Sequence, residues 1–144
     1  MVEFTLFKIP IRVEPVFWIT LGLIGFLSVR GLPGDAALMG TALFVIAGFI
    51  SILIHELGHA LMIKKYNLPT EIVLSSFGGY ATHPAGILTR KESFLVTLAG
   101  PAIQLAFGLA VYFLAPYLNL PNFMMQLFIS FLYGVSIFLS LIHI

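Results

Sequence analysis

Four long apolar segments, almost without charge, restrict the fold of this chain more than any other feature of its sequence. They cover residues 15–29, 36–63, 94–118 and 123–144. Only 9% of the 144 residues are charged and 60% are hydrophobic, whereas soluble domains carry about 25% charged residues. A water-soluble fold of this size could not cover its surface with so few charges. We therefore predict an α-helical polytopic membrane protein with about four transmembrane helices, the first of them shorter than the usual span of about 20 residues.

Two further segments have the pattern of short interfacial β-strands. Apolar and polar residues alternate over residues 3–14, as they do in a half-buried strand. In the 70–82 segment, β-branched residues precede Gly78 and Gly79, which favours a strand or hairpin over a helix. The N-terminal strand is expected to lie at the membrane surface and to pair with another interfacial strand further along. No linker or repeat divides the chain, so residues 1–144 are expected to form one membrane-embedded domain.

The distribution of positive charge predicts the orientation in the membrane. If four helices cross in turn, Arg30 falls on one side, and the other six of the seven Lys and Arg residues fall on the opposite side: Lys8, Arg12, Lys64, Lys65, Arg90 and Lys91. The side richer in Lys and Arg is normally cytoplasmic. Both termini are therefore expected in the cytosol, and the protein in the cell (plasma) membrane. The lack of a basic cluster argues against a nucleic-acid partner, and the lack of cysteine excludes a thiolate metal site.

The motif His55-Glu56-Leu57-Gly58-His59 lies inside the second apolar segment. Histidines four residues apart lie one turn apart on the same face of a helix, so both imidazoles can bind one zinc ion, at about 2.0–2.1 Å. Glu56 can then act as the general base towards a water on the metal and pass the proton to the leaving amine. Ionisable residues inside a span are costly, and a metal with its water would compensate for that cost. The motif therefore predicts a Zn²⁺ hydrolase site.

Two histidines do not complete such a site, because a catalytic zinc usually has three protein ligands. The residues after His59 lack the third histidine that follows in soluble metzincins. Glu71, Glu92 and His83 are distant candidates, and Glu92 is better placed to cap the third span. In the alternative interpretation, the two histidines only form hydrogen bonds across a helix bundle, and the adjacent glutamate is buried in its protonated form.

The third apolar segment contains three residues for which the sequence suggests a role. Gly100 and Pro101 are expected to allow close packing against the helix that carries the histidines. Gln104 lies one turn further on. It can donate a hydrogen bond to a substrate carbonyl, or it can form an interhelical hydrogen bond, and the sequence does not separate these roles.

In their order along the chain, these motifs resemble the site-2 protease family of intramembrane zinc metalloproteases, peptidase family M50. The resemblance covers nearly the full length. Its four elements are the strand before the first span, the zinc motif, a membrane-associated hairpin and a glycine–proline motif, which here read Ile9-Pro10-Ile11-Arg12-Val13, His55-Glu56-Leu57-Gly58-His59-Ala60, Phe77-Gly78-Gly79-Tyr80 and Ala99-Gly100-Pro101-Ala102.

The resemblance implies a function and assigns residues to it. It implies an endopeptidase that cuts membrane-embedded protein substrates within the lipid bilayer, near the cytosolic face. His55 and His59 would bind Zn²⁺, and Glu56 would be the catalytic residue. The hairpin residues would contact the substrate, which must unwind before its peptide bonds are accessible, by addition of a strand: Phe77, Gly78, Gly79 and Tyr80.

The sequence departs from the family pattern at the third ligand. That ligand is an aspartate in a later Leu-Asp-Gly segment, and no aspartate follows Asp35 here. The run from Ser136 resembles the approach to that segment, with His143 in place of an expected asparagine and as a further candidate ligand. We therefore interpret the chain as C-terminally incomplete, and expect it to bind zinc weakly and turn over slowly or not at all.

Two other classes of function remain as alternatives. One is a catalytically inactive membrane scaffold that keeps the fold without the third zinc ligand. The other is a zinc transporter, which would place acidic residues or histidines in several spans. In this sequence they concentrate in one span, so the transporter ranks last.

Overall fold

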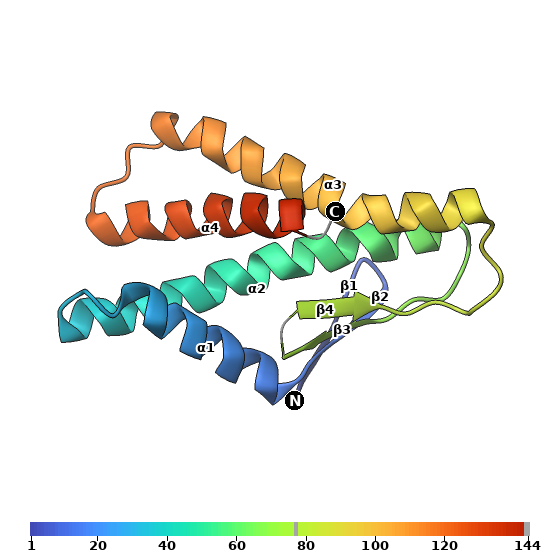
Figure 1. The fold of residues 1–144 in the computed structure, drawn as a ribbon, viewed down its shortest axis with the longest axis horizontal. Helices are drawn as coiled ribbons and strands as arrows, with labels where there is room; N and C mark the ends of the chain where they lie inside the picture. Colours follow the sequence, from blue (N-terminus) through green and yellow to red (C-terminus); the bar gives the residue numbers. More distant parts are fainter. Residues whose placement is uncertain (77, 143–144) are drawn as a thin grey trace.

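Four helices follow the four apolar segments (Figure 1). The computed structural model describes residues 1–76 and 78–142. The helices are α1 (Pro15–Val29), α2 (Gly34–Lys65), α3 (Arg90–Leu114) and α4 (Phe123–Ile142), with a short 3₁₀ turn, η1 (Ala115–Tyr117), after α3. Within the described part of the chain, α2, α3 and α4 are long and apolar enough to cross a membrane. α1 has 15 residues, which span about 22 Å at 1.5 Å per residue, so it is shorter than an apolar bilayer core of about 30 Å.

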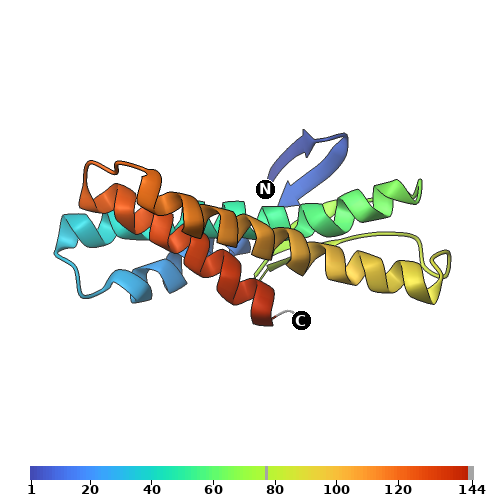
Figure 2. The same cartoon turned by 90° about the horizontal axis from the view of Figure 1, so that it is seen from above.

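α2 is the central helix of the molecule. α1, α3 and α4 all pack against it, and α3 and α4 also pack against each other. Figures 1 and 2 show α2 running along the long axis of the molecule between these neighbours. Glycines allow the close approach: a Cβ on Gly48 would lie 3.1 Å from Leu21 of α1, and a Cβ on Gly58 would lie 2.5 Å from the carbonyl oxygen of Ala99 of α3. Small residues at such contacts are typical of helix packing in membranes.

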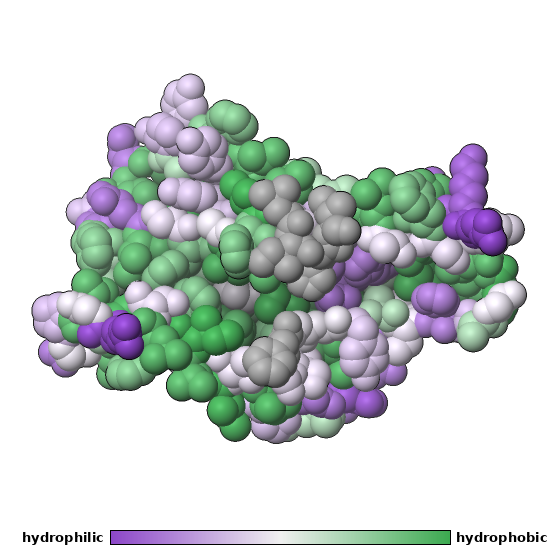
Figure 3. Space-filling model, in the orientation of Figure 1, coloured by the Kyte–Doolittle hydropathy of each residue, from purple (hydrophilic) through white to green (hydrophobic). Residues whose placement is uncertain are grey.

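The outer surface of the helices is apolar. Ile19, Leu38 and Phe113, on three different helices, are 70%, 74% and 65% exposed. Figure 3 shows extensive hydrophobic areas on one face, while most of the strongly hydrophilic residues lie towards its margins. A soluble monomer rarely exposes so much contiguous apolar surface. The structure therefore agrees with the predicted polytopic membrane fold.

A four-stranded sheet lies beside α2. Its order is β1 (Val2–Leu6), β2 (Ile9–Val13), β3 (Ile72–Ser75) and β4 (Gly78–Ala81). β1 and β2 form an antiparallel hairpin, β2 pairs in parallel with β3, and β3 pairs antiparallel with β4. The predicted pairing of the N-terminal strand with a later strand is thus confirmed. The buried face of the sheet packs with α1 and α2 into one core, through Ile9, Ile11, Val13, Ile72 and Leu74.

Local signals fix the ends of two elements. α3 begins at Arg90, four residues before the predicted apolar segment, because Thr89 and Glu92 form a capping box. The backbone N–H of Thr89 donates to Glu92 Oε2 at 2.8 Å, and that of Glu92 donates to Thr89 Oγ1 at 3.2 Å. The expected capping role of Glu92 is therefore confirmed.

The turn between β1 and β2 has its own local signal. Phe7 and Lys8 have φ values of 50° and 62°, as a tight hairpin turn requires.

Candidate metal centre

His55, Glu56 and His59 lie in the C-terminal third of α2, facing α3 and β4. His55 and Glu56 are 6% and 4% exposed, and His59 is half-buried. Gly58 and Gly100 let α3 approach this turn, because a side chain on Gly100 would collide with the His59 ring and one on Gly58 would collide with Ala99. The expected packing role of Gly100 is therefore confirmed.

The two imidazoles face each other through their Nε2 atoms, which are 3.1 Å apart. Each Nδ1 atom points away from the pair, towards an oxygen. His59 Nδ1 lies 2.7 Å from the carbonyl oxygen of Val96, and His55 Nδ1 lies 2.9 Å from Oε1 of Gln104. Because a carbonyl oxygen can only accept, each Nδ1 atom is the donor. Each neutral ring therefore presents the lone pair of Nε2 to the other.

This arrangement fits a metal ion better than it fits a hydrogen bond between the rings. Since both Nδ1 atoms already donate, a proton between the two Nε2 atoms would leave one imidazole doubly protonated and charged in a buried place. A cation between the lone pairs removes that conflict. Two nitrogens bound at about 2.0–2.1 Å to a tetrahedral zinc ion are about 3.3–3.4 Å apart, close to the observed 3.1 Å. The pair therefore fits zinc as two of its ligands.

A third ligand does not join the pair within residues 1–76 and 78–142, where no group of three His, Cys, Asp or Glu residues is arranged to hold a metal. Glu92 is engaged in the capping box, and Glu71 forms an ion pair with Arg12 at 3.3 Å. His83 lines a cavity beside the motif, with its Nδ1 3.1 Å from the carbonyl oxygen of Pro84. His143 lies outside the described residues.

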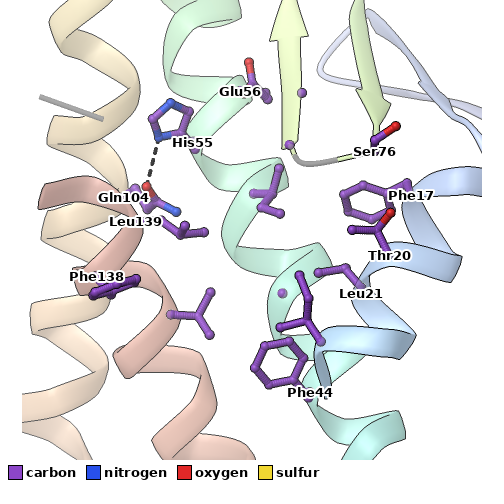
Figure 4. A pocket seen from close by; sticks show the side chains of 16 residues that line it. Phe17, Thr20, Leu21, Phe44, His55, Glu56, Ser76, Gln104, Phe138 and Leu139 are labelled. Carbon is purple, nitrogen blue, oxygen red and sulfur yellow. Dashed lines mark hydrogen bonds between the residues drawn. The ribbon is translucent and has the colours of Figure 1, made fainter. Parts of the chain in front are cut away.

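Two cavities meet at the motif, and both are lined by His55, Glu56 and Gly79. The first, of about 280 Å³, is apolar and runs between α1, α2 and α4. Figure 4 shows it bounded by Phe17, Thr20 and Leu21 of α1 and by Phe138 and Leu139 of α4, while Glu56 lies near β4. The second, also of about 280 Å³, is more polar and is lined by His59, Tyr80, His83 and Thr97. The motif is thus accessible from an apolar side and from a polar side.

β4 passes directly over Glu56 and leaves one backbone edge unpaired by β3. A Cβ on Gly79 would lie 2.9 Å from Glu56 Cγ, so only glycine fits there. The N–H of Thr82 donates to the Glu71 carbonyl at 2.8 Å, and antiparallel strands alternate the direction of their backbone groups. The N–H and C=O groups of Gly79 and Ala81 therefore point away from β3, and both residues line the second cavity.

Three of the four predicted substrate-contact residues lie in β4. Gly78, Gly79 and Tyr80 are in β4, and Gly79 and Tyr80 line the polar cavity. Phe77 lies outside the described residues. Ala81, which the sequence interpretation did not include, lines the same cavity and lies on the same unpaired edge of β4 as Gly79. Its signal was the alternation of the strand, because it stands two residues after Gly79 and shares its edge.

Of the four buried polar residues behind His55, the sequence interpretation singled out Gln104 and missed the three serines. Ser51, Gln104, Ser136 and Ser140 are all 0% exposed and form a hydrogen-bonded network between α2, α3 and α4. Of the two roles left open for Gln104, the structure shows the interhelical hydrogen bond. The sequence signal for the serines was their spacing: Ser51 precedes His55 by one turn, and Ser136 and Ser140 are one turn apart in an apolar helix.

Comparison with known proteins adds to this geometry. No protein-family model matches the sequence. A Synechocystis sp. protein named as a candidate zinc metalloprotease is 32% identical over 127 residues, which are 81% of this chain and 33% of the relative. A zinc metalloprotease of Methanocaldococcus jannaschii is 26% identical over 118 residues, again 81% and 33%. The chain thus spans about a third of the length of these relatives.

The fold is also similar to a solved structure. The site-2 protease from Methanocaldococcus jannaschii superposes with a TM-score of 0.71, over 98% of this chain and 62% of that protein, at 22% sequence identity. At this identity the likeness concerns the fold. It includes the helices that carry the histidine pair and its partners.

Proposed function

We propose that this chain, which its relatives and its fold assign to the site-2 protease family of zinc metalloproteases, forms the metal-binding and catalytic part of an intramembrane endopeptidase. One observation carries the proposal: two imidazole lone pairs face each other at 3.1 Å inside an apolar helix, next to a buried glutamate. The proposed substrates are membrane-embedded protein segments, and the proposed cofactor is Zn²⁺.

The residues of the motif have separate roles in this proposal. His55 and His59 hold the zinc ion through Nε2, and their Nδ1 protons remain on Gln104 and Val96. When bound, zinc supplies Lewis acidity that polarises the scissile carbonyl and acidifies water. Glu56 takes the proton of the attacking water and delivers it to the leaving amine, a general acid–base role that the adjoining polar cavity can supply with water.

The unpaired edge of β4 is the proposed substrate platform. A helical membrane segment has no free backbone groups, so it must unwind before it can be cut. An extended segment can then pair with Gly79 and Ala81 by strand addition, which brings its backbone over Glu56. The predicted contacts of Phe77, Gly78 and Tyr80 with substrate belong to the same proposal, and the apolar cavity would receive side chains that arrive from the lipid.

The proposed site lies near the cytosolic face. His59 precedes Lys64 by five residues of helix, which is about 8 Å along the axis. Lys64 donates to the carbonyl oxygen of Phe7 in the β1–β2 turn at 2.8 Å. The N-terminal hairpin therefore contacts the same end of α2. Together with the charge distribution, this supports cytosolic termini in a multi-pass protein, and the plasma membrane is its proposed location.

Ala81→Pro should weaken substrate binding without disturbing the metal. The substitution removes one N–H from the outer edge of β4, and proline is tolerated where the N–H side of an edge strand is unpaired. The loss of one hydrogen bond, about 0.5–1.5 kcal/mol, should raise KM about two- to tenfold. KM for a membrane reporter peptide and zinc content in detergent are the measurements.

Tyr80→Pro is the matched contrast, because the Tyr80 N–H faces Val73 in the β3–β4 ladder. That variant should lower the unfolding temperature, while Ala81→Pro should not. Unchanged KM in Ala81→Pro would show that substrate does not pair with this edge.

Zinc content tests the proposed metal site directly. When His55 or His59 is replaced by Ala, the zinc content of the protein purified in detergent should fall about tenfold or more below that of the unmodified protein. The reason is that each histidine supplies one ligand. His83→Ala is the control, because that histidine is exposed and contacts Pro84. Equal zinc in all four proteins would contradict the site.

The inactive scaffold remains as the second candidate. It is favoured by one observation, that the described residues bring no third ligand to the pair. A scaffold of this kind would lack zinc and would cut no membrane segment. The proposed protease would bind zinc and would cut such a segment.

A further inference from the structure

Gln104 is a fully enclosed polar side chain next to the histidines. It is 0% exposed and lies on α3, three residues after Pro101. Its amide nitrogen donates to Ser51 Oγ at 2.9 Å and to the Ser51 carbonyl at 3.3 Å, both on α2. Its Oε1 lies 2.9 Å from His55 Nδ1 and 3.0 Å from Ser140 Oγ of α4. One side chain therefore contacts both neighbouring helices.

These partners fix which way the amide points. The Ser51 carbonyl oxygen can only accept, so it requires the NH₂ group of Gln104 on its side. Oε1 is then left facing His55, and Oε1 can only accept. A reversed amide would place Oε1 against the Ser51 carbonyl oxygen and leave a buried donor facing His55. That arrangement would leave buried polar groups unsatisfied, which costs about 1–3 kcal/mol each.

The orientation of the Gln104 amide determines which ring nitrogen of His55 carries the proton. With Oε1 opposite Nδ1, the neutral ring holds its proton on Nδ1 and exposes the lone pair of Nε2 towards His59. His59 obtains the same orientation from the backbone carbonyl of Val96 at 2.7 Å. The two histidines thus differ in what orients them: a side chain orients His55, and the backbone orients His59.

We propose that Gln104 is the positioning residue of the candidate metal centre, which holds His55 in its Nδ1-protonated tautomer with Nε2 directed to the shared ion. Ser51 sets the orientation of the amide, and Ser140 extends the restraint to α4. The effect of Gln104 on zinc affinity rests on the proposed function, whereas its effect on the His55 tautomer does not. Partners that orient a metal-binding histidine in this way typically change metal affinity 10- to 100-fold when removed.

The first test is the tautomer itself, in the metal-free protein. In detergent at a pH where the rings are neutral, ¹⁵N-histidine NMR should show His55 protonated on Nδ1. Gln104→Leu should populate the other tautomer, while His59 keeps its signal because its acceptor is backbone. Gln126→Leu, the same change at an exposed position of α4, is the matched control and should leave both histidines unchanged.

The second test is zinc affinity. Gln104→Leu should weaken it about 10- to 100-fold, and Gln104→Glu, which keeps an acceptor opposite His55, should restore most of the loss. If Gln104→Leu does not fold, Gln104→Asn serves in its place, because its amide is one methylene too short to contact His55. An unchanged His55 tautomer in the folded Leu or Asn variant would overturn the inference, whatever the protein does to substrates.

Discussion

In a protein that contains this chain together with a third zinc ligand, Glu56→Gln should abolish proteolysis while zinc stays bound. Glutamine has the shape of glutamate but cannot take a proton from water, and general acid–base catalysis contributes about 10²- to 10⁴-fold to rate. The imidazoles keep their own partners on Gln104 and Val96, so the metal ligands are not disturbed. Cleavage of a membrane-embedded reporter in liposomes, with zinc measured on the same sample, gives both quantities.

Glu92→Gln is the control for this experiment. The capping box accepts glutamine in place of glutamate, so α3 should begin at the same residue and activity should be retained. If Glu56→Gln cut the reporter at the unmodified rate, Glu56 would not be the acid–base residue. If it lost zinc together with activity, its role would be structural.

Gly58→Ala should separate α2 from α3 at the metal centre. The new methyl group would lie 2.5 Å from the carbonyl oxygen of Ala99 and 2.9 Å from its carbonyl carbon. Both are backbone atoms, so no side-chain rotation relieves the collision. Overpacking of this kind typically costs about 1–3 kcal/mol. Because the His59 partner Val96 lies one turn from Ala99, the same shift should lengthen the His59–Val96 hydrogen bond and lower zinc retention.

The matched control is Gly22→Ala in α1. A Cβ there meets no atom within 4 Å, and alanine in a helix is about 0.5–1 kcal/mol more favourable than glycine. Thermal unfolding in detergent should therefore show Gly58→Ala well below the unmodified protein and Gly22→Ala at or above it. Equal unfolding temperatures for the two variants would contradict the close contact between α2 and α3.

The helices were predictable because their signal is local. Apolar runs long enough for a bilayer predicted α2 and α4 to within two residues of the ends that the structure describes. α3 begins four residues before its apolar run, since hydropathy does not register the cap made by Thr89 and Glu92. The sequence predicted that the N-terminal strand pairs with a later strand, but not that β2 and β3 pair in parallel. That register depends on how α1 and α2 pack, because both helices lie between the two strands in the chain.

The candidate site was predictable to the same extent. His55 and His59 meet because four residues make about one turn, and that needs no knowledge of the fold. The partners of their Nδ1 atoms come from α3, and the partners of Gln104 come from α2 and α4. These contacts depend on the rotation and separation of packed helices. The sequence could mark Gln104 as a polar residue in a span, but could not tell which group it would face.

The parallel β2–β3 pair also sets an order of assembly. β2 is made before α1 and α2, and its partner β3 follows them. A growing chain therefore cannot complete this sheet until both helices have left the ribosome, and the loop closed by the pairing contains the whole of both. β4 follows β3 directly, pairs with it as a local hairpin and covers Glu56. The turn of α2 that carries Glu56 therefore stays uncovered by β4 until the chain has been made as far as residue 81, while α3 and α4 are still to follow.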